Sequence, residues 1–149
     1  MIALRRASAD DLAAVTALQQ AAYAKNRVLL GVEPLPLTAD YAAVFSTYEV
    51  WLADGAHGLD GVLILQARPD DLLIWSVATA PAAQRSGVGN RLLAFAESHA
   101  RGLGLRCIRL YTGEPLTGNI AWYQRHGYVH ERIEQLPDRR LVHLIKHLE

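Results

Sequence analysis

The amino-acid sequence predicts one α/β (α+β) domain over residues 1–149, with a mixed, largely antiparallel sheet of about seven strands flanked by about four helices. Three observations lead to this prediction. The chain has 149 residues, of which 51% are hydrophobic, and this suits one ordinary globular domain with its own core. Short apolar runs typical of strands alternate with segments whose apolar residues recur at helical spacing. No repeat, low-complexity tract or interdomain linker divides the sequence.

The first elements are a short strand and an amphipathic helix. The strand candidate is Ile2–Arg6. Ser8 and Asp11 then form a capping-box pattern, which marks the start of a helix that we expect to run to about Tyr23. Three apolar residues at helical spacing give this helix its buried face: Leu12, Val15 and Leu18.

A second short helix and a hairpin are expected next. The segment Gly31–Pro36 interrupts the helical pattern, and Thr38 is expected to cap the second helix. Its apolar residues are Tyr41, Val44 and Phe45. The runs Val50–Ala53 and Val62–Ala67 are strand-like, and the glycines between them predict a hairpin.

The middle of the chain contains the most apolar strand and the longest helix. Leu72–Ala78 is almost continuously apolar, which predicts a strand in the middle of the sheet. Pro81 ends it, because proline has no N–H group to give to a neighbouring strand. The helix covers Val88–Arg101, and Gly102 and Gly104 stop it.

The last part of the chain predicts a strand, a helix and a second hairpin. Cys107–Tyr111 is a buried strand candidate, and Asn119–His126 is a short helix closed by Gly127. Tyr128–Ile133 and Leu141–His147 form the final hairpin.

Composition and charge exclude several classes of function. The formal net charge is zero, with 15 basic and 15 acidic residues, so we expect no nucleic-acid partner. No apolar run approaches the ~20 residues of a membrane helix, and no secretory signal is evident, so we expect no membrane partner. The lone Cys107 cannot form an internal disulfide. A reducing, cytoplasmic location is therefore the expectation.

A glycine-containing loop is the most informative motif. The residues Gln84-Arg85-Ser86-Gly87-Val88-Gly89 connect the apolar strand to the long helix. A helix N-terminus has unpaired N–H groups and partial positive charge, and glycine lets them approach an anion closely. The loop therefore suits a phosphate or pyrophosphate, although a simple turn would have similar residues.

Two common nucleotide motifs are excluded by the residues that follow. A Walker loop needs Lys-Ser or Lys-Thr after its last glycine, whereas Asn90 and Arg91 follow Gly89. A dinucleotide fingerprint that began at Gly87 would need glycine or alanine at position 92, which is Leu92.

The sequence resembles the GNAT superfamily of acyl-CoA-dependent N-acetyltransferases. The loop Gln84–Gly89 matches that family's Gln/Arg-x-x-Gly-x-Gly/Ala pattern in full. The segment from Asn119 to Tyr128 resembles the Asn-x-x-x-Tyr-x-x-x-Gly-Phe/Tyr segment of many members. The strand that ends in Ser76-Val77-Ala78 resembles the strand that pairs with the pantetheine arm, and the order of elements agrees over essentially the whole chain. The resemblance implies a GNAT-like domain that uses acetyl-CoA as its acyl-donor substrate.

The resemblance also implies roles for individual residues. Backbone groups of three strand residues would bind pantetheine: Val77, Ala78 and Thr79. The loop and the first helical turn would hold the pyrophosphate: Gln84, Arg85, Ser86, Gly87, Val88, Gly89 and Asn90. The Asn119 side chain would fix the pantetheine or the end of the donor, and Tyr123 would stand near the thioester sulfur.

Acetyl transfer needs a neutral amine, a polarised carbonyl and a proton for the leaving thiolate. A free alkylamine has a pKa near ~10.4 and is protonated at neutral pH, and an ordinary thiol has a pKa near ~8.5. A strand amide such as that of Val77 or Ala78 would polarise the carbonyl. Tyr123 suits the role of general acid, the alternative being a tyrosine that only packs.

The general base stays open. Many relatives have a glutamate on the strand before the loop, but here that strand begins Leu72-Leu73-Ile74-Trp75 and has no carboxylate. Three carboxylates elsewhere are candidates: Glu49, Glu114 and Asp71. Direct attack by an amine whose pKa the site has lowered is the alternative without a base.

Two further features concern a possible acceptor segment and the absence of a metal-binding pattern. The segment Lys25–Leu37 is apolar for a connection, and in the family such segments line the acceptor pocket; covering the sheet is the other interpretation. Cys107 is expected in the core, and the histidines have no spacing typical of metal ligands.

Two functions are therefore compared. The first is transfer of acetyl from acetyl-CoA to a primary amine of a small molecule, peptide or protein by direct attack, with Tyr123 as general acid. The second is a non-catalytic acyl-CoA-binding sensor or regulatory module. The amine acceptor is the expected partner, and a homodimer is compatible with either function.

Overall fold

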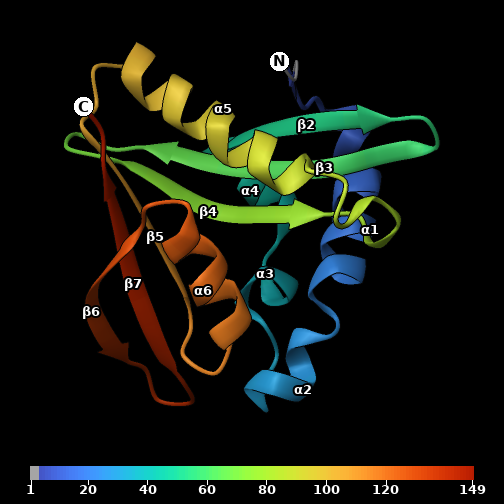
Figure 1. Ribbon diagram of the computed structural model, residues 1–149. Helices are drawn as coiled ribbons and strands as arrows, with labels where there is room; N and C mark the ends of the chain where they lie inside the picture. The colour runs from blue at the N-terminus through green and yellow to red at the C-terminus, as the bar shows by residue number, and fades with distance from the viewer. Residues whose placement is uncertain (1–3) are drawn as a thin grey trace.

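The seven predicted strands form one mixed sheet in the computed structural model, which describes residues 4–149. The strands are β1 (Arg5–Arg6), β2 (Glu49–Gly55), β3 (Gly58–Ala67), β4 (Leu72–Thr79), β5 (Cys107–Gly113), β6 (Val129–Gln135) and β7 (Arg140–His147). Their order across the sheet is β1-β2-β3-β4-β5-β7-β6 (Figure 1). Only the β4–β5 pair is parallel, and every other neighbouring pair is antiparallel. The predicted fold class is confirmed, with β4 in the middle of the sheet as expected.

Four main helices flank the sheet, and two short helices lie in the connection between the first two of them. The helices are α1 (Leu12–Tyr23), α2 (Asn26–Leu30), α3 (Leu35–Thr38), α4 (Tyr41–Thr47), α5 (Val88–Gly102) and α6 (Thr117–Arg125). Helices α5 and α6 cover one face, and α1 and α4 lie on the other (Figure 1). None of the helices in residues 4–149 has the length and apolar character needed to cross a membrane.

The hydrophobic core has two layers, one on each side of the sheet. Strand β3 supplies both, because Val62–Leu65 are four consecutive buried residues with side chains that alternate between the faces. Leu63 and Leu65 belong to the cluster that contains α5, whereas Val62 and Ile64 belong to the cluster with α1 and α4. A strand covered on both faces is expected to be continuously apolar, which explains the run in the sequence.

One of the two predicted helix caps is present and the other lies at a different residue. The Asp11 carboxylate accepts a hydrogen bond from the Ser8 amide at 2.8 Å, so the capping box is present. The predicted cap Thr38 is wrong, because its hydroxyl donates to the Leu35 carbonyl inside α3. Asp40 caps α4 instead, and its carboxylate accepts from the Ala42 amide at 3.0 Å.

The first strand is shorter in the structure than in the prediction. Among the described residues of this segment, 4–6, Arg5 and Arg6 pair with β2, opposite Leu52 and Trp51. Part of the predicted strand Ile2–Arg6 lies outside the described residues.

The sheet opens between β4 and β5. These strands pair only over Leu72–Ile74 and Ile108–Leu110, although both continue for several residues beyond. Figure 1 shows the two strands running apart from this point. A bulge lies at the same place, because Ile64 and Leu65 of β3 pair with Ser76 and Ile74, which leaves Trp75 without a partner in β3. Bulges bend the strand that carries them.

Candidate functional site

The predicted loop lies between the end of β4 and the start of α5 (Figure 1). Gly87 is the N-cap of α5 and has a φ of 86°, and Arg85 also has a positive φ of 66°. The first backbone hydrogen bond of the helix runs from the Arg91 amide to the Gly87 carbonyl at 3.1 Å. The amides before Arg91 lie in the first turn of α5, where helix geometry leaves N–H groups without a helical acceptor. This is an anion-binding geometry at the N-terminus of a long helix.

The two glycines of the loop have different structural roles. A Cβ on Gly87 would meet no atom within 4 Å, so the space above it is open, and glycine is favoured there by its positive φ. A Cβ on Gly89 would lie 3.0 Å from Cζ2 of Trp122. Gly89 therefore lets α6 approach α5. His126 Nε2, on the residue after α6, lies 3.0 Å from Asn90 Oδ1, which links the two helices a second time.

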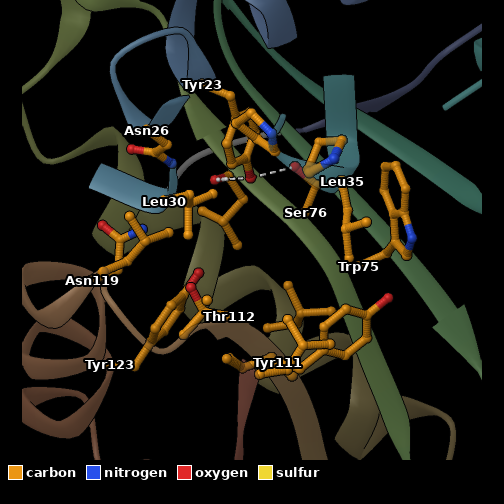
Figure 2. A pocket seen from close by; sticks show the side chains of 18 of the residues that line it. Tyr23, Asn26, Leu30, Leu35, Trp75, Ser76, Tyr111, Thr112, Asn119 and Tyr123 are labelled. Carbon is orange, nitrogen blue, oxygen red and sulfur yellow. Dashed lines mark hydrogen bonds between the residues drawn. The ribbon is translucent and has the colours of Figure 1, made fainter. Parts of the chain in front are cut away.

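A cavity with a volume of about 140 Å³ lies in the opening between β4 and β5 (Figure 2). Of the residues predicted for the site, Val77, Asn119 and Tyr123 line it. The structure does not bring Ala78, Thr79 or the glycine loop into its wall. Those residues lie further along β4 and at the start of α5.

The segment between α1 and α4 forms another wall of the cavity. Five residues of Lys25–Leu37 line it: Asn26, Leu30, Pro34, Leu35 and Pro36. This segment was predicted to be a connection between two helices, whereas α2 and α3 occupy much of it. Leu30 reaches Gly113 on β5, where an added Cβ would lie 2.5 Å from Leu30 Cδ2. This contact brings the segment against the end of β5.

Tyr123 points from α6 into the cavity (Figure 2). Its ring packs against Trp122 and Tyr128, with centroid distances of 5.0 and 5.8 Å. Burial raises the pKa of Tyr123 well above its usual value, so the phenol keeps its proton at neutral pH. A protonated phenol that faces a cavity can donate a hydrogen bond there, and its raised pKa makes it a weaker acid than an exposed tyrosine.

The three carboxylates considered as general bases have partners elsewhere. Glu49 accepts a hydrogen bond from the Trp51 indole and lies 3.0 Å from His99 on α5. Glu114 pairs with Arg140 at 3.5 Å. None of the three lines the cavity, and no carboxylate belongs to its wall among the described residues.

Asp71, the third candidate, is held by two arginines. Arg68 donates two hydrogen bonds to it at 2.6 Å, and Arg109 donates one at 2.8 Å. Hydrogen bonds from Arg68 hold the pKa of Asp71 below its usual value. A carboxylate stabilised in this way is a weak base.

A buried polar network beside the cavity was missed by the sequence analysis. The Gln19 amide donates to Ser76 Oγ at 2.9 Å and to the Tyr41 hydroxyl at 3.0 Å. The Tyr23 hydroxyl lies 2.8 Å from Ser76 Oγ and donates to the Val77 carbonyl at 3.3 Å (Figure 2). The available signal was Ser76, a polar residue within an apolar strand that then needs partners.

Cys107 lies in the core, and His143 contacts a carboxylate on the neighbouring strand. Cys107 is buried in β5, as expected. His143 lies 2.8 Å from Glu134 on the neighbouring strand. Within residues 4–149 no three side chains of the His, Cys, Asp and Glu types are placed to hold a metal ion together.

Comparisons with solved structures find the same fold in several proteins. The ribosomal-protein-S18-alanine N-acetyltransferase of Escherichia coli is 18% identical with a TM-score of 0.80, covering 100% of this chain and 95% of that one. A GNAT family acetyltransferase of Elizabethkingia anophelis, solved with acetyl-CoA bound, is 19% identical with a TM-score of 0.73, covering 99% and 98%. An IAA acetyltransferase of Bacillus cereus is 21% identical with a TM-score of 0.73, covering 99% and 100%.

A match to a family model identifies the family, whereas the solved structures show only the fold. No curated protein matches the chain by sequence. The model of the acetyltransferase (GNAT) family matches residues 16–128, which is most of the chain and includes β4, the glycine loop and Tyr123. The protein therefore belongs to the GNAT family of acyl-CoA-dependent N-acetyltransferases, as the sequence predicts.

Proposed function

We propose that this protein transfers the acetyl group of acetyl-CoA to a primary amine by direct attack, with Tyr123 as the general acid. The observation that carries this proposal is the position of Tyr123, a protonated phenol that lines the cavity where β4 and β5 separate. Acetyl-CoA is present in the solved structure of the Elizabethkingia relative, which supports the choice of donor.

The donor is held mainly by backbone groups in this proposal. The pyrophosphate lies against the amides at the start of α5, over the open space above Gly87, with Gln84–Asn90 around it. The pantetheine arm runs along the separated part of β4, where it uses backbone groups of Val77, Ala78 and Thr79. Asn119 and Tyr123 then flank the thioester end.

The reaction joins the amine nitrogen to the acetyl carbon. A neutral amine attacks the thioester carbonyl, whose oxygen is stabilised by a strand amide such as that of Val77 or Ala78. The C–N bond forms and the C–S bond breaks. The thiolate takes the proton of Tyr123, and the proton lost by the amine returns to the phenolate through solvent. The products are the acetamide and free coenzyme A.

The described residues that line the cavity include no carboxylate, so we propose that the amine arrives neutral. A protonated amine is disfavoured in a low-dielectric cavity, and its pKa therefore falls on entry. This supports direct attack over the three base candidates from the sequence.

A thiol-release assay separates the enzyme from the sensor. The purified protein is mixed with acetyl-CoA and a panel of primary amines, and free thiol is followed over many turnovers. Binding of the donor is checked separately by melting, where acetyl-CoA at about 100 times its Kd would add about 2.7 kcal/mol of stability.

Amine-dependent turnover would support the enzyme. A melting shift with no turnover for any amine would support the non-catalytic sensor. The homodimer stays a separate prediction, for which sedimentation equilibrium is the test.

A further inference from the structure

We infer that the acceptor is a small monoamine with an uncharged, apolar and preferably aromatic body; this inference rests on the proposed function. It comes from the charge, the aromatic surface and the small volume of the cavity. The acceptor would occupy the half of the cavity that faces away from Asn119 and Tyr123 (Figure 2).

The described residues that line the cavity include no carboxylate to pair with a second positive charge. Arg139 is its only formally charged residue among the described residues that line it, and it is positive. Arg139 already donates two hydrogen bonds to Asp138, at 3.1 and 3.0 Å, and one to the Glu33 carbonyl at 2.8 Å. An acceptor with two or more ammonium groups would therefore leave one of them desolvated and unpaired, which is strongly unfavourable.

Two aromatic side chains lie on the side of the cavity that is opposite the proposed donor contacts. Trp75 and Tyr111 lie on the side opposite Asn119 and Tyr123 (Figure 2). The bulge in β4 sets Trp75 apart from the pairing with β3. Trp75 stacks on Tyr48 with a centroid distance of 5.5 Å, and this contact supports its ring. A supported indole is a suitable surface for an aromatic or aliphatic group.

A hydrogen bond joins two chain segments beside the cavity. The hydrogen bond from Arg139 Nη1 to the Glu33 carbonyl joins the β6–β7 turn to the α2–α3 connection. These segments are 106 positions apart in the sequence. The whole cavity has a volume of about 140 Å³, and the acceptor shares it with the thioester end of the donor, which limits the acceptor to a small group. A small side group fits this space better than a folded protein surface.

Matched acceptors test the inference in the thiol-release assay. The probes are 2-phenylethylamine, hexylamine, 1,5-diaminopentane and a short peptide with a free N-terminal alanine. We expect kcat/KM for 2-phenylethylamine to exceed that for 1,5-diaminopentane by at least about 100-fold, because only the diamine buries an unpaired charge. Hexylamine should lie between them.

Two outcomes contradict the inference while the proposed function stands. Equal or better use of the diamine would show that a carboxylate outside the cavity wall serves the acceptor. Preference for the peptide would show that the cavity opens to a polypeptide. No turnover with any probe would overturn the proposed function itself, and this inference with it.

A designed carboxylate gives a second test. Leu35 lines the cavity as the first residue of α3. Leu35→Glu supplies the missing negative charge, and Leu35→Gln is the uncharged control of the same size. We expect the glutamate variant to raise the ratio of diamine to phenylethylamine kcat/KM by about tenfold over the glutamine variant. Equal ratios in two variants that bind acetyl-CoA like the parent would contradict the role of charge.

Discussion

The two sides of the cavity are built in different ways. On the donor side, the proposed contacts come from backbone: the edge of β4 and the amides at the start of α5, with Gly87 at a positive φ. On the acceptor side they come from side chains that meet from α1, the α2–α3 connection, β4 and β5. Backbone recognition imposes a local pattern of glycines on the sequence. Side-chain recognition imposes none, so an acceptor site can change while the donor site stays.

The largest effect is expected from Tyr123→Phe, which removes one hydroxyl where the two sides meet. The ring and its packing stay, but the proton for the leaving thiolate is lost. A positioned general acid contributes about 10²–10⁴ in rate. We expect kcat to fall by that factor in steady-state assays, with KM for acetyl-CoA little changed.

Tyr128→Phe is the matched control for this change. The Tyr128 hydroxyl is buried and has no hydrogen-bond partner among the described residues. Removing it should leave kcat within about twofold, because it lies outside the cavity wall. Similar losses in both variants would point to packing and not to proton donation.

Gly87→Val tests the backbone side of the comparison. The β-branched side chain would occupy the open space above the loop and would be strained at a φ of 86°. We expect acetyl-CoA affinity, measured by titration calorimetry, to fall by about 10–100-fold as one or two hydrogen bonds to the phosphates are lost.

Gly102→Val provides a control at the other end of α5. A Cβ at Gly102 also meets no atom within 4 Å, and this glycine is not among those with a positive φ. Its acetyl-CoA affinity should match the parent. If Gly87→Val binds the donor as tightly as the parent does, the loop is only a turn.

Ser76→Ala tests the side-chain network next to the cavity. It leaves Gln19 and Tyr23 each without one partner in a buried place. We expect the free energy of unfolding in urea to fall by about 1–3 kcal/mol. Acetyl-CoA affinity should change little, because the donor contacts are backbone groups. A large loss of donor affinity with unchanged stability would show that this side-chain network takes part in donor binding, and would contradict the difference between the two sides.

The smallest effects are expected at the carboxylates that the structure places away from the cavity. Glu49→Gln and Glu114→Gln should leave kcat/KM within about twofold in the thiol-release assay, since neither side chain lines the cavity. A loss of about 10²–10⁴ in either variant would identify it as the general base.

The order of strands and helices could be predicted because burial leaves a local pattern of apolar residues in the sequence. The apolar run of β4 and the period of α5 are such signatures. Helices α2 and α3 could not be predicted, since they are one turn long and owe their form to contacts such as that of Leu30 with Gly113. The cap of α4 was misplaced because Thr38 and Asp40 are both good capping residues.

The site follows the same division. The loop and Tyr123 were proposed as site residues from short motifs in the sequence. The network of Gln19, Tyr23 and Ser76 joins residues up to 57 positions apart, so no local pattern marks it. The proposed acceptor wall is assembled in the same way, and for that reason the sequence pointed to a segment, Lys25–Leu37, but to no acceptor.

The most direct test of the account measures whether Tyr123 protonates the leaving thiolate. The ratio of kcat between the parent and Tyr123→Phe is measured with acetyl-CoA and with the acetyl thioester of a coenzyme A analogue whose thiol is more acidic. A more acidic thiol needs less protonation as it leaves, so the account predicts a smaller ratio with the analogue. The same large ratio with both donors would contradict proton donation by Tyr123.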